Sequence, residues 1–170
     1  MFVSWHDEKH HLRGCIGTFS PRPILQGLTE YAKISAFRDH RFDPIRWDEV
    51  PNLSCSVSLL TNFEEILEDP LDWTIGKHGI KLSLKDEKTQ KIHSATFLPE
   101  VAQEQAWTQK VTFAALIKKS GINSSSSKYI VNSIITGGEY DQFSLVSLVR
   151  YQSSITRVHH NDWISNKAKV

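Results

Sequence analysis

Residues 53–60 read "LSCSVSLL", and this stretch carries the clearest secondary-structure signal in the chain. Leu53, Cys55, Val57 and Leu59 alternate with three serines. Because the side chains of a strand point alternately to its two faces, the pattern predicts a strand with one apolar face and one face of small polar groups. A strand with two such faces is typical of an antiparallel sheet.

Two further strands are expected upstream of this one. "MFVSW" (1–5) and "LRGCIGTF" (12–19) are separated by the polar "HDEKHH", so they can pair as a hairpin. Other expected elements are a helix from Ile24 to near Phe37, a connection over 38–52 interrupted by Pro44 and Pro51, a hairpin of 80–84 with 91–98, a helix over 108–121, a flexible loop over 123–128 and a strand over 141–153.

These elements alternate irregularly and include hairpins, which predicts an α+β fold with a mainly antiparallel sheet and flanking helices. The length of 170 residues suits one domain, and the hydrophobic fraction of 39% is ordinary for a folded protein. The net charge of +1 gives no basic excess of the kind that nucleic-acid binding requires, so a nucleic-acid partner is not expected.

The sequence also limits the compartment of the protein. Two cysteines in a chain of this length do not make a disulfide framework, which favours a reducing environment. No apolar run approaches the ~20 residues of a membrane span, and the start "MFVSWHDEKHH" is too polar for a signal peptide. We therefore expect a cytoplasmic and/or nuclear protein that does not bind a membrane.

Five segments, in order, resemble the AMME syndrome candidate gene 1 (AMMECR-type) domain family. "LRGCIGTF" is similar to the signature region of that family, and the agreement covers roughly residues 1–150. The other four segments are "ILQGLTEYAKISAFRDHRFDPI", "LSCSVSLLT", "IGKHGIKL" and "ATFLPEVAQEQAW". The resemblance implies an antiparallel sheet with flanking helices and a smaller subdomain.

The resemblance implies little about activity, because no catalytic residues are established for the family. Members occur in archaea, bacteria and eukaryotes, and some prokaryotic members are linked to Memo-like proteins or radical SAM enzymes. The human member is described as nuclear. Family members usually carry a helical segment before the first strand, whereas this sequence starts at that strand. We expect the domain to cover 1–153 and a peripheral or mobile tail to cover 154–170.

Cys15 is the first candidate for a functional residue. The glycines on either side, Gly14 and Gly17, let a ligand approach the backbone closely. Arg13 nearby could favour a thiolate that acts as a nucleophile or a redox thiol. The alternative is a cysteine that only packs inside a strand, which is the commoner case.

Arg13 has two interpretations of similar weight. A charged side chain in an apolar strand has to reach solvent, a carboxylate or an anionic ligand. It could clamp a phosphate or carboxylate together with the backbone N–H groups of Gly14 and Gly17. It could instead form a structural bridge, for example to Asp39 or Asp43. Alternation in a strand would place Arg13 on the same side as Cys15.

The loop after the first helix is the second candidate region. "FRDHRFDP" (37–44) offers two cations, Arg38 and Arg41, an acid, Asp39, and a base, His40. The alternative is a solvated loop whose aspartates hold turns. We expect a cleft that joins this loop with the LRGCIG stretch and binds a small anionic ligand or a protein partner.

Two other functions compete with a binding or regulatory domain. In an enzyme, for which the family resemblance implies Memo-like or radical SAM partners, Cys15 would be the nucleophile or a redox thiol. His40, His78 or His93 would act as its base. A nucleic-acid binder would use Arg38, Arg41 and Arg46 with Phe42 and Trp47 between them. The sequence contains neither C-x-x-C nor H-E-x-x-H, so no metal site is predicted, and no cofactor can be named.

Overall fold

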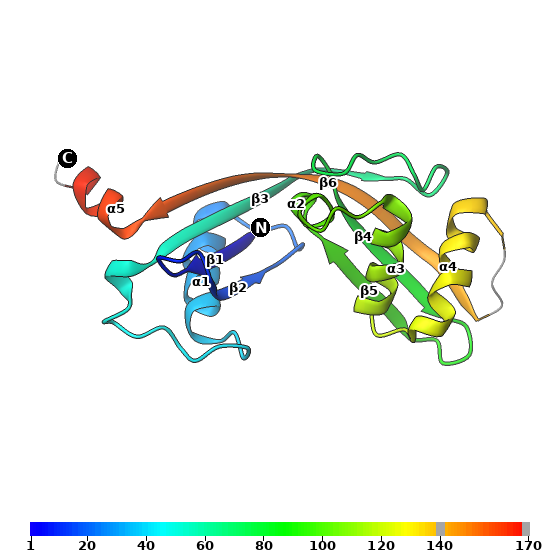
Figure 1. The fold of residues 1–170 in the computed structure, drawn as a ribbon, viewed down its shortest axis with the longest axis horizontal. Coiled ribbons are helices and arrows are strands. Elements are labelled where there is room, and N and C mark those ends of the chain that lie inside the picture. Colours follow the sequence, from blue (N-terminus) through cyan, green and yellow to red (C-terminus); the bar gives the residue numbers. More distant parts are fainter. Residues whose placement is uncertain (139–141, 168–170) are drawn as a thin grey trace. The chain divides into compact units, whose positions relative to one another are not determined.

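The computed structural model describes residues 1–138 and 142–167, and within them it has the α+β fold that the sequence predicts (Figure 1). Six strands follow the hydrogen-bonded order β2-β1-β3-β6-β4-β5. The elements are β1 (Phe2–His6), β2 (Leu12–Gly17), α1 (Ile24–Phe37), the 3₁₀ turn η1 (Val50–Asn52), β3 (Ser54–Glu65), β4 (Gly79–Asp86), β5 (Ile92–Phe97), α2 (Pro99–Glu104), α3 (Gln109–Lys119), α4 (Ser124–Thr136), β6 (Phe143–His159) and α5 (His160–Lys167).

The chain forms two compact units. The first unit comprises residues 1–60 and 154–170, and the second comprises residues 61–153. Strands β3 and β6 contribute residues to both units. The LRGCIG stretch and the loop after α1 both lie in the first unit, so this unit contains the region of the expected site.

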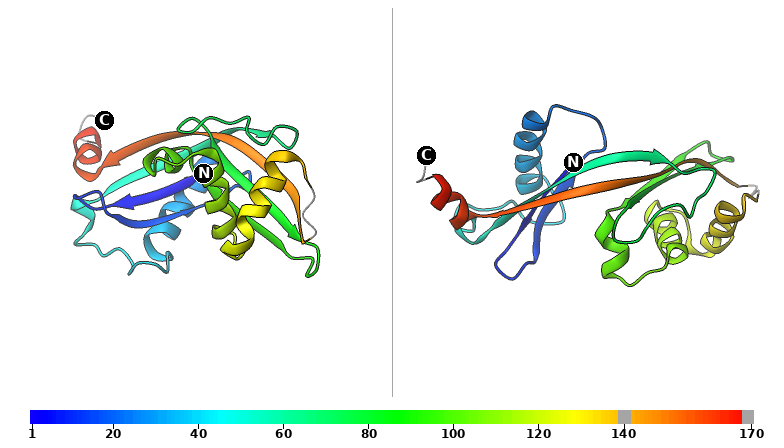
Figure 2. Two further views of the ribbon diagram at one scale, coloured as in Figure 1. Left: turned by 45° about the vertical axis from the view of Figure 1, so that its right-hand side comes forward. Right: turned by 90° about the horizontal axis from the view of Figure 1, so that it is seen from above.

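In the first unit, β1 and β2 form the predicted hairpin, and α1 packs on one side of it (Figure 2). The Asp7 carboxylate closes the turn by accepting hydrogen bonds from the backbone N–H groups of Lys9 (2.9 Å) and His11 (2.8 Å). Gly14 is buried where α1 crosses β2, and a Cβ atom there would overlap the carbonyl oxygen of Ser35. The glycine therefore allows the helix to approach the strand closely.

Strand β3 has the two faces that the alternation predicts, and the serine face is the more buried one. β1 pairs with β3 in a regular antiparallel register, with Ser4 opposite Ser56 and His6 opposite Ser54. The serines of β3 are buried, whereas Cys55 is only partly buried. The reason is that α1 lies over β1 and β2, and this leaves the apolar side of β3 incompletely covered.

The second unit has its own apolar core. The β4–β5 hairpin forms around the charged turn as predicted, and α3 packs against β5 and α4. Thr108 caps the start of α3, because its hydroxyl accepts a hydrogen bond from the Val111 N–H, and Gly121 with φ of 90° follows the end of the helix. The core is built by Ile66, Trp73, Ile80, Leu82, Leu84, Phe113, Leu116, Ile117, Ile122, Ile130, Val131, Ile134, Phe143 and Leu148.

Two elements differ from the expectations, and one helix lies where no element is predicted. The expected flexible loop over 123–128 lies mostly inside α4. The additional helix is α2, which begins at Pro99, where a proline suits the first turn of a helix. The sequence predicts that the last strand ends at residue 153, but β6 continues to His159 and α5 follows. The polar composition of this segment conceals the strand, because its side chains are largely exposed. Residue 141, the expected start of the strand, lies outside the described residues.

The contact at Gly14 makes a prediction about stability. Gly14→Ala should reduce the free energy of unfolding by roughly 1–3 kcal/mol, because the added methyl group forces α1 away from β2. Chemical denaturation measures the change. Cys15→Ala is the control, because Cys15 is the next residue and its side chain lies on the opposite face. It should reduce the free energy of unfolding by at most about 1 kcal/mol. Equal effects of the two substitutions would contradict the close helix–strand contact.

Candidate functional site

Arg13 is held in an ion pair. Its Nη2 donates to both carboxylate oxygens of Glu49, at 2.8 and 3.0 Å, and to the backbone oxygen of Asp43 at 3.3 Å. Arg13 in turn lowers the pKa of Glu49 through these hydrogen bonds. The guanidinium is thus engaged by the segment that follows α1, which is the arrangement expected of a structural bridge, although the main carboxylate is Glu49 rather than Asp39 or Asp43.

Arg13 and Cys15 do not share partners. In the β1–β2 register Trp5 faces Gly14 and His6 faces Leu12, so Arg13 is an extra residue in a β-bulge. A bulge redirects the side chain at that position. The alternation that would place Arg13 beside Cys15 is therefore interrupted.

Cys15 is fixed through its backbone by the loop after α1. Its N–H donates to Asp39 Oδ2 at 2.8 Å, and its carbonyl oxygen accepts from Arg41 Nη2 at 3.1 Å. Arg41 also donates to Asp39 through Nε at 2.9 Å and Nη2 at 2.7 Å. Because β2 stands at the end of the strand order, these two side chains bind backbone groups that have no neighbouring strand to pair with.

The surroundings of the Asp39 carboxylate favour its ionised form. Its side chain is only 4% exposed, and the hydrogen bonds from Arg41 and from the Cys15 N–H hold its pKa well below the usual range. The same pairing raises the pKa of Arg41. Asp39 and Arg41 therefore join the loop to the sheet through direct contacts with the backbone of Cys15.

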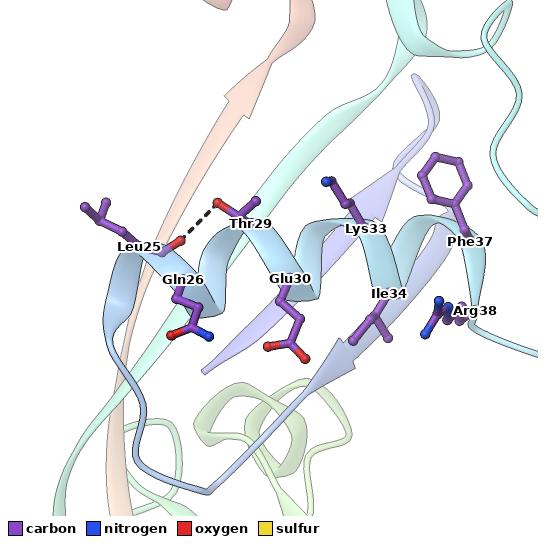
Figure 3. Close-up of a pocket in the computed structure, with 8 residues that line it drawn as sticks. All are labelled: Leu25, Gln26, Thr29, Glu30, Lys33, Ile34, Phe37 and Arg38. Atoms are coloured by element: carbon purple, nitrogen blue, oxygen red, sulfur yellow. Dashed lines mark hydrogen bonds between the residues drawn. The ribbon is translucent and has the colours of Figure 1, made fainter.

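The remaining residues of the expected cleft lie elsewhere or have a packing role. A Cβ atom at Gly17 would overlap Phe2, so this glycine makes room for a side chain of β1. His40 is exposed. Phe37 and Arg38 line a hollow of about 850 Å³ along the outer side of α1, together with Leu25, Gln26, Thr29, Glu30, Lys33 and Ile34 (Figure 3). No β2 residue lines that hollow.

The Cys15 side chain belongs to a row of polar groups that crosses four strands. Ser4 lies opposite both Cys15 in β2 and Ser56 in β3, so the three side chains share the face of the sheet opposite to α1. Ser4 Oγ donates to Cys15 Sγ at 3.2 Å, and Arg157 Nε of β6 donates to Ser56 Oγ at 2.8 Å. We call Cys15, Ser4, Ser56 and Arg157 the polar row.

Two buried polar atoms next to the polar row lack partners among the described residues. His6 and Ser54 lie opposite each other, one pair along the same face, and His6 Nδ1 and Ser54 Oγ are buried without a hydrogen bond. Burial and the nearby Arg157 lower the pKa of His6, which keeps its imidazole neutral at pH 7. Buried polar groups are normally satisfied by protein, water or a ligand.

Sequence reasoning missed Ser4, His6, Ser56 and Arg157. Arg157 is 101 residues from Ser56 along the chain, and it follows the boundary at which the domain was expected to end. The serine alternation of β3 is visible in the sequence, but only the pairing of β3 with β1 and β6 shows that its polar face meets Cys15.

The two other histidines proposed as bases belong to the second unit. His78 Nδ1 accepts a hydrogen bond from the Thr74 N–H at 2.9 Å and closes a turn, and His93 Nδ1 lies 3.1 Å from the Ser120 carbonyl oxygen. Within residues 1–138 and 142–167 no group of three or more His, Cys, Asp or Glu side chains could hold a metal ion. The same residues include no helix that is long and apolar enough to cross a membrane.

Comparison with known proteins identifies relatives over most of the chain. The AMMECR1 family model matches residues 1–134. An uncharacterised Arabidopsis thaliana protein is 38% identical over 97% of this chain and 73% of its own length, and one from Saccharomyces cerevisiae is 38% identical over 95% and 70%. A crystal structure of an uncharacterised Pyrococcus horikoshii protein superposes with a TM-score of 0.68 at 25% identity, over 92% of this chain and 71% of that one.

The role of Asp39 can be tested by substitution. Asp39→Asn should reduce the free energy of unfolding by about 2 kcal/mol at pH 7, because it weakens charge-assisted hydrogen bonds to a buried group. The pKa of Asp39 is lowered in the folded state, so its contribution is complete above about pH 4 and declines as the pH falls further. The difference between wild type and variant should therefore narrow towards pH 2.

Denaturation at several pH values measures this difference. Asp48→Asn is the matched control, because Asp48 pairs with Arg46 at an exposed position, where an ion pair contributes little to the free energy of unfolding. A variant as stable as wild type at pH 7 would show that Asp39 does not hold the edge of β2.

Proposed function

This chain belongs to the AMMECR1 family, and on that premise we propose that its first unit binds a small anionic ligand at the polar row. The observation that carries the proposal is the alignment of Cys15, Ser4, Ser56 and Arg157 across one face of the sheet. Serine hydroxyls and a guanidinium are the donors that recognise phosphate and carboxylate groups.

The cation of this site is Arg157 and not Arg13. Arg13 is neutralised by Glu49, whereas the described residues give Arg157 a single hydrogen bond, from Nε to Ser56. Its two Nη groups remain as donors for a ligand. The partnerless His6 Nδ1 and Ser54 Oγ beside the row support the same interpretation, because a bound ligand could satisfy them.

The loop over 37–43 has a supporting role in this proposal. Asp39 and Arg41 fix the backbone of Cys15 and so set the position of its thiol. Binding sites require side chains that are held in place by a surrounding set of contacts. A reducing compartment, cytoplasmic or nuclear, suits the proposal because Cys15 is a free thiol.

Ligand-induced stabilisation tests the proposal. Inorganic phosphate, pyrophosphate and succinate serve as probes, and at tenfold above Kd a bound probe should stabilise the wild type by about 1.4 kcal/mol. Arg157→Gln should abolish the gain. Arg46→Gln is the control, since Arg46 is exposed in the loop after α1. Equal stabilisation of wild type and Arg157→Gln, or none in wild type, would contradict the proposal.

An enzyme that uses Cys15 is the second candidate function. Its support is that the Cys15 thiol lies in a polar row, whereas Cys55 lies on the apolar face, where burial raises its pKa to about 11. A thiolate is the reactive form, and a rise of two pKa units lowers the thiolate fraction on the order of 100-fold. The two cysteines should therefore react at very different rates.

Thiol labelling of the native protein measures that difference. With iodoacetamide at pH 8, Cys15 should be modified at least about tenfold faster than Cys55, and mass spectrometry of peptides assigns the site. In urea the two rates should become similar. Equal inertness of both cysteines in the native protein would remove the thiol-enzyme alternative and leave the binding proposal untouched.

A further inference from the structure

We propose that the first unit has a second binding site, on the opposite face of the sheet from the polar row, for a neutral planar aromatic molecule that carries one hydrogen-bond donor. The site is a hollow of about 510 Å³, a size typical of small-molecule pockets. We call it the tryptophan pocket. It is lined by Trp5, Trp47, Val50, Leu53, Cys55, Val57, Thr156, Val158, His159, His160 and Trp163.

The pocket forms because α1 covers only part of its face of the sheet. α1 packs on β1 and β2, so the side chains of β3 and β6 on that face, including Cys55, Val57 and Val158, form an uncovered floor. α5 packs against η1 and closes one end, where the His160 N–H donates to the Leu53 carbonyl oxygen at 3.2 Å. The hollow is therefore bounded by elements from both ends of the chain.

Three tryptophans from three separate segments favour an aromatic occupant. Trp5 is fixed, because its indole N–H donates to the Ala32 carbonyl oxygen and to Ser35 Oγ, both at 3.1 Å. Trp47 is 88% exposed and Trp163 is 52% exposed, so both rings present large apolar surfaces to the hollow and to solvent. Aromatic rings that stack or meet edge to face gain free energy in addition to that of burying their apolar area.

His160 supplies the polar contact. Its Nδ1 is buried and has no partner among the described residues, and its ring centroid lies 6.2 Å from that of Trp163. A neutral imidazole that carries its proton on Nε2 can accept a hydrogen bond at Nδ1. A ligand N–H or O–H group would satisfy this atom.

The ligand is expected to be neutral, because no Asp, Glu, Lys or Arg lines the pocket among the described residues. Burial keeps the Cys55 thiol protonated, so it does not add a negative charge. A charged molecule would lose its hydration without gaining a partner. The tryptophan pocket thus selects against the anions that suit the polar row.

Indole is a direct probe, because it is planar, neutral and has one N–H donor. The protein has five tryptophans, and two of them, Trp73 and Trp107, belong to the second unit. In ¹⁵N-labelled full chain, a titration with indole should shift the side-chain N–H signals of Trp5, Trp47 and Trp163 in a saturable way. The signals of Trp73 and Trp107 serve as internal controls and should not move.

Two comparisons test the chemistry of the pocket. 1-Methylindole lacks the donor and should bind wild type about three- to tenfold more weakly than indole, the effect of one hydrogen bond. In His160→Phe the two probes should bind equally. Val158→Asp should weaken the binding of indole at least about tenfold, because it places a charge on the apolar floor of the pocket. Val146→Asp, at a similarly exposed valine of β6 outside the pocket, should bind indole as wild type does.

Three results would overturn the proposal. The first is no saturable shift of any tryptophan signal. The second is equal shifts of all five tryptophan signals, which would mean that indole binds non-specifically. The third is a wild-type dimer in sedimentation that Val158→Asp dissociates, because a second copy of the chain would then cover the pocket.

Discussion

The first unit depends on the hydrogen bonds that Asp39 and Arg41 form with the backbone of Cys15. β2 stands at the end of the strand order, so the N–H and carbonyl groups of Cys15 on that edge need partners from outside the sheet. Asp39 and Arg41 supply them from the loop that follows α1. The same segment carries Glu49, which binds Arg13, so the LRGCIG stretch is held by it at two positions, Arg13 and Cys15.

This attachment fixes the two faces of the sheet. The absence of a side chain at Gly14 lets α1 lie close against one face. The opposite face carries the thiol of Cys15 beside Ser4, Ser56 and Arg157. One face therefore holds polar groups at hydrogen-bonding distance, and the other holds α1 and an apolar hollow. The two proposed sites differ in chemistry because they lie on different faces.

Much of the fold could be predicted from local pattern. The alternation around Cys55, the β1–β2 hairpin and the helix from Ile24 to Phe37 are present as expected, because period-2 and period-3.6 spacing act over a few residues. The extension of β6 to His159 could not be predicted, since its exposed side chains leave no apolar alternation, and the serine run that begins α4 is typical of a loop.

The candidate site was only partly accessible to sequence reasoning. The family resemblance and the chemistry of the loop predict only that the loop lies near the LRGCIG stretch, and not the hydrogen bonds of Asp39 and Arg41 to the backbone of Cys15. The partner of Arg13, the bulge beside it and the contribution of Arg157 were not predicted either, because each depends on pairing between segments far apart in the chain. A one-residue irregularity in register is enough to separate two side chains that simple alternation would place together.

The most direct test of anion binding at the polar row is chemical-shift mapping of the ¹⁵N-labelled protein during a titration with inorganic phosphate. Binding at the polar row predicts that the largest saturable shifts occur at Ser4, Cys15, Ser56 and the Nε–H of Arg157. Shifts centred on Arg38, His40 and Arg41 would assign the anion to the loop instead. Together with an unperturbed Arg157, that result would contradict a ligand site on the polar row.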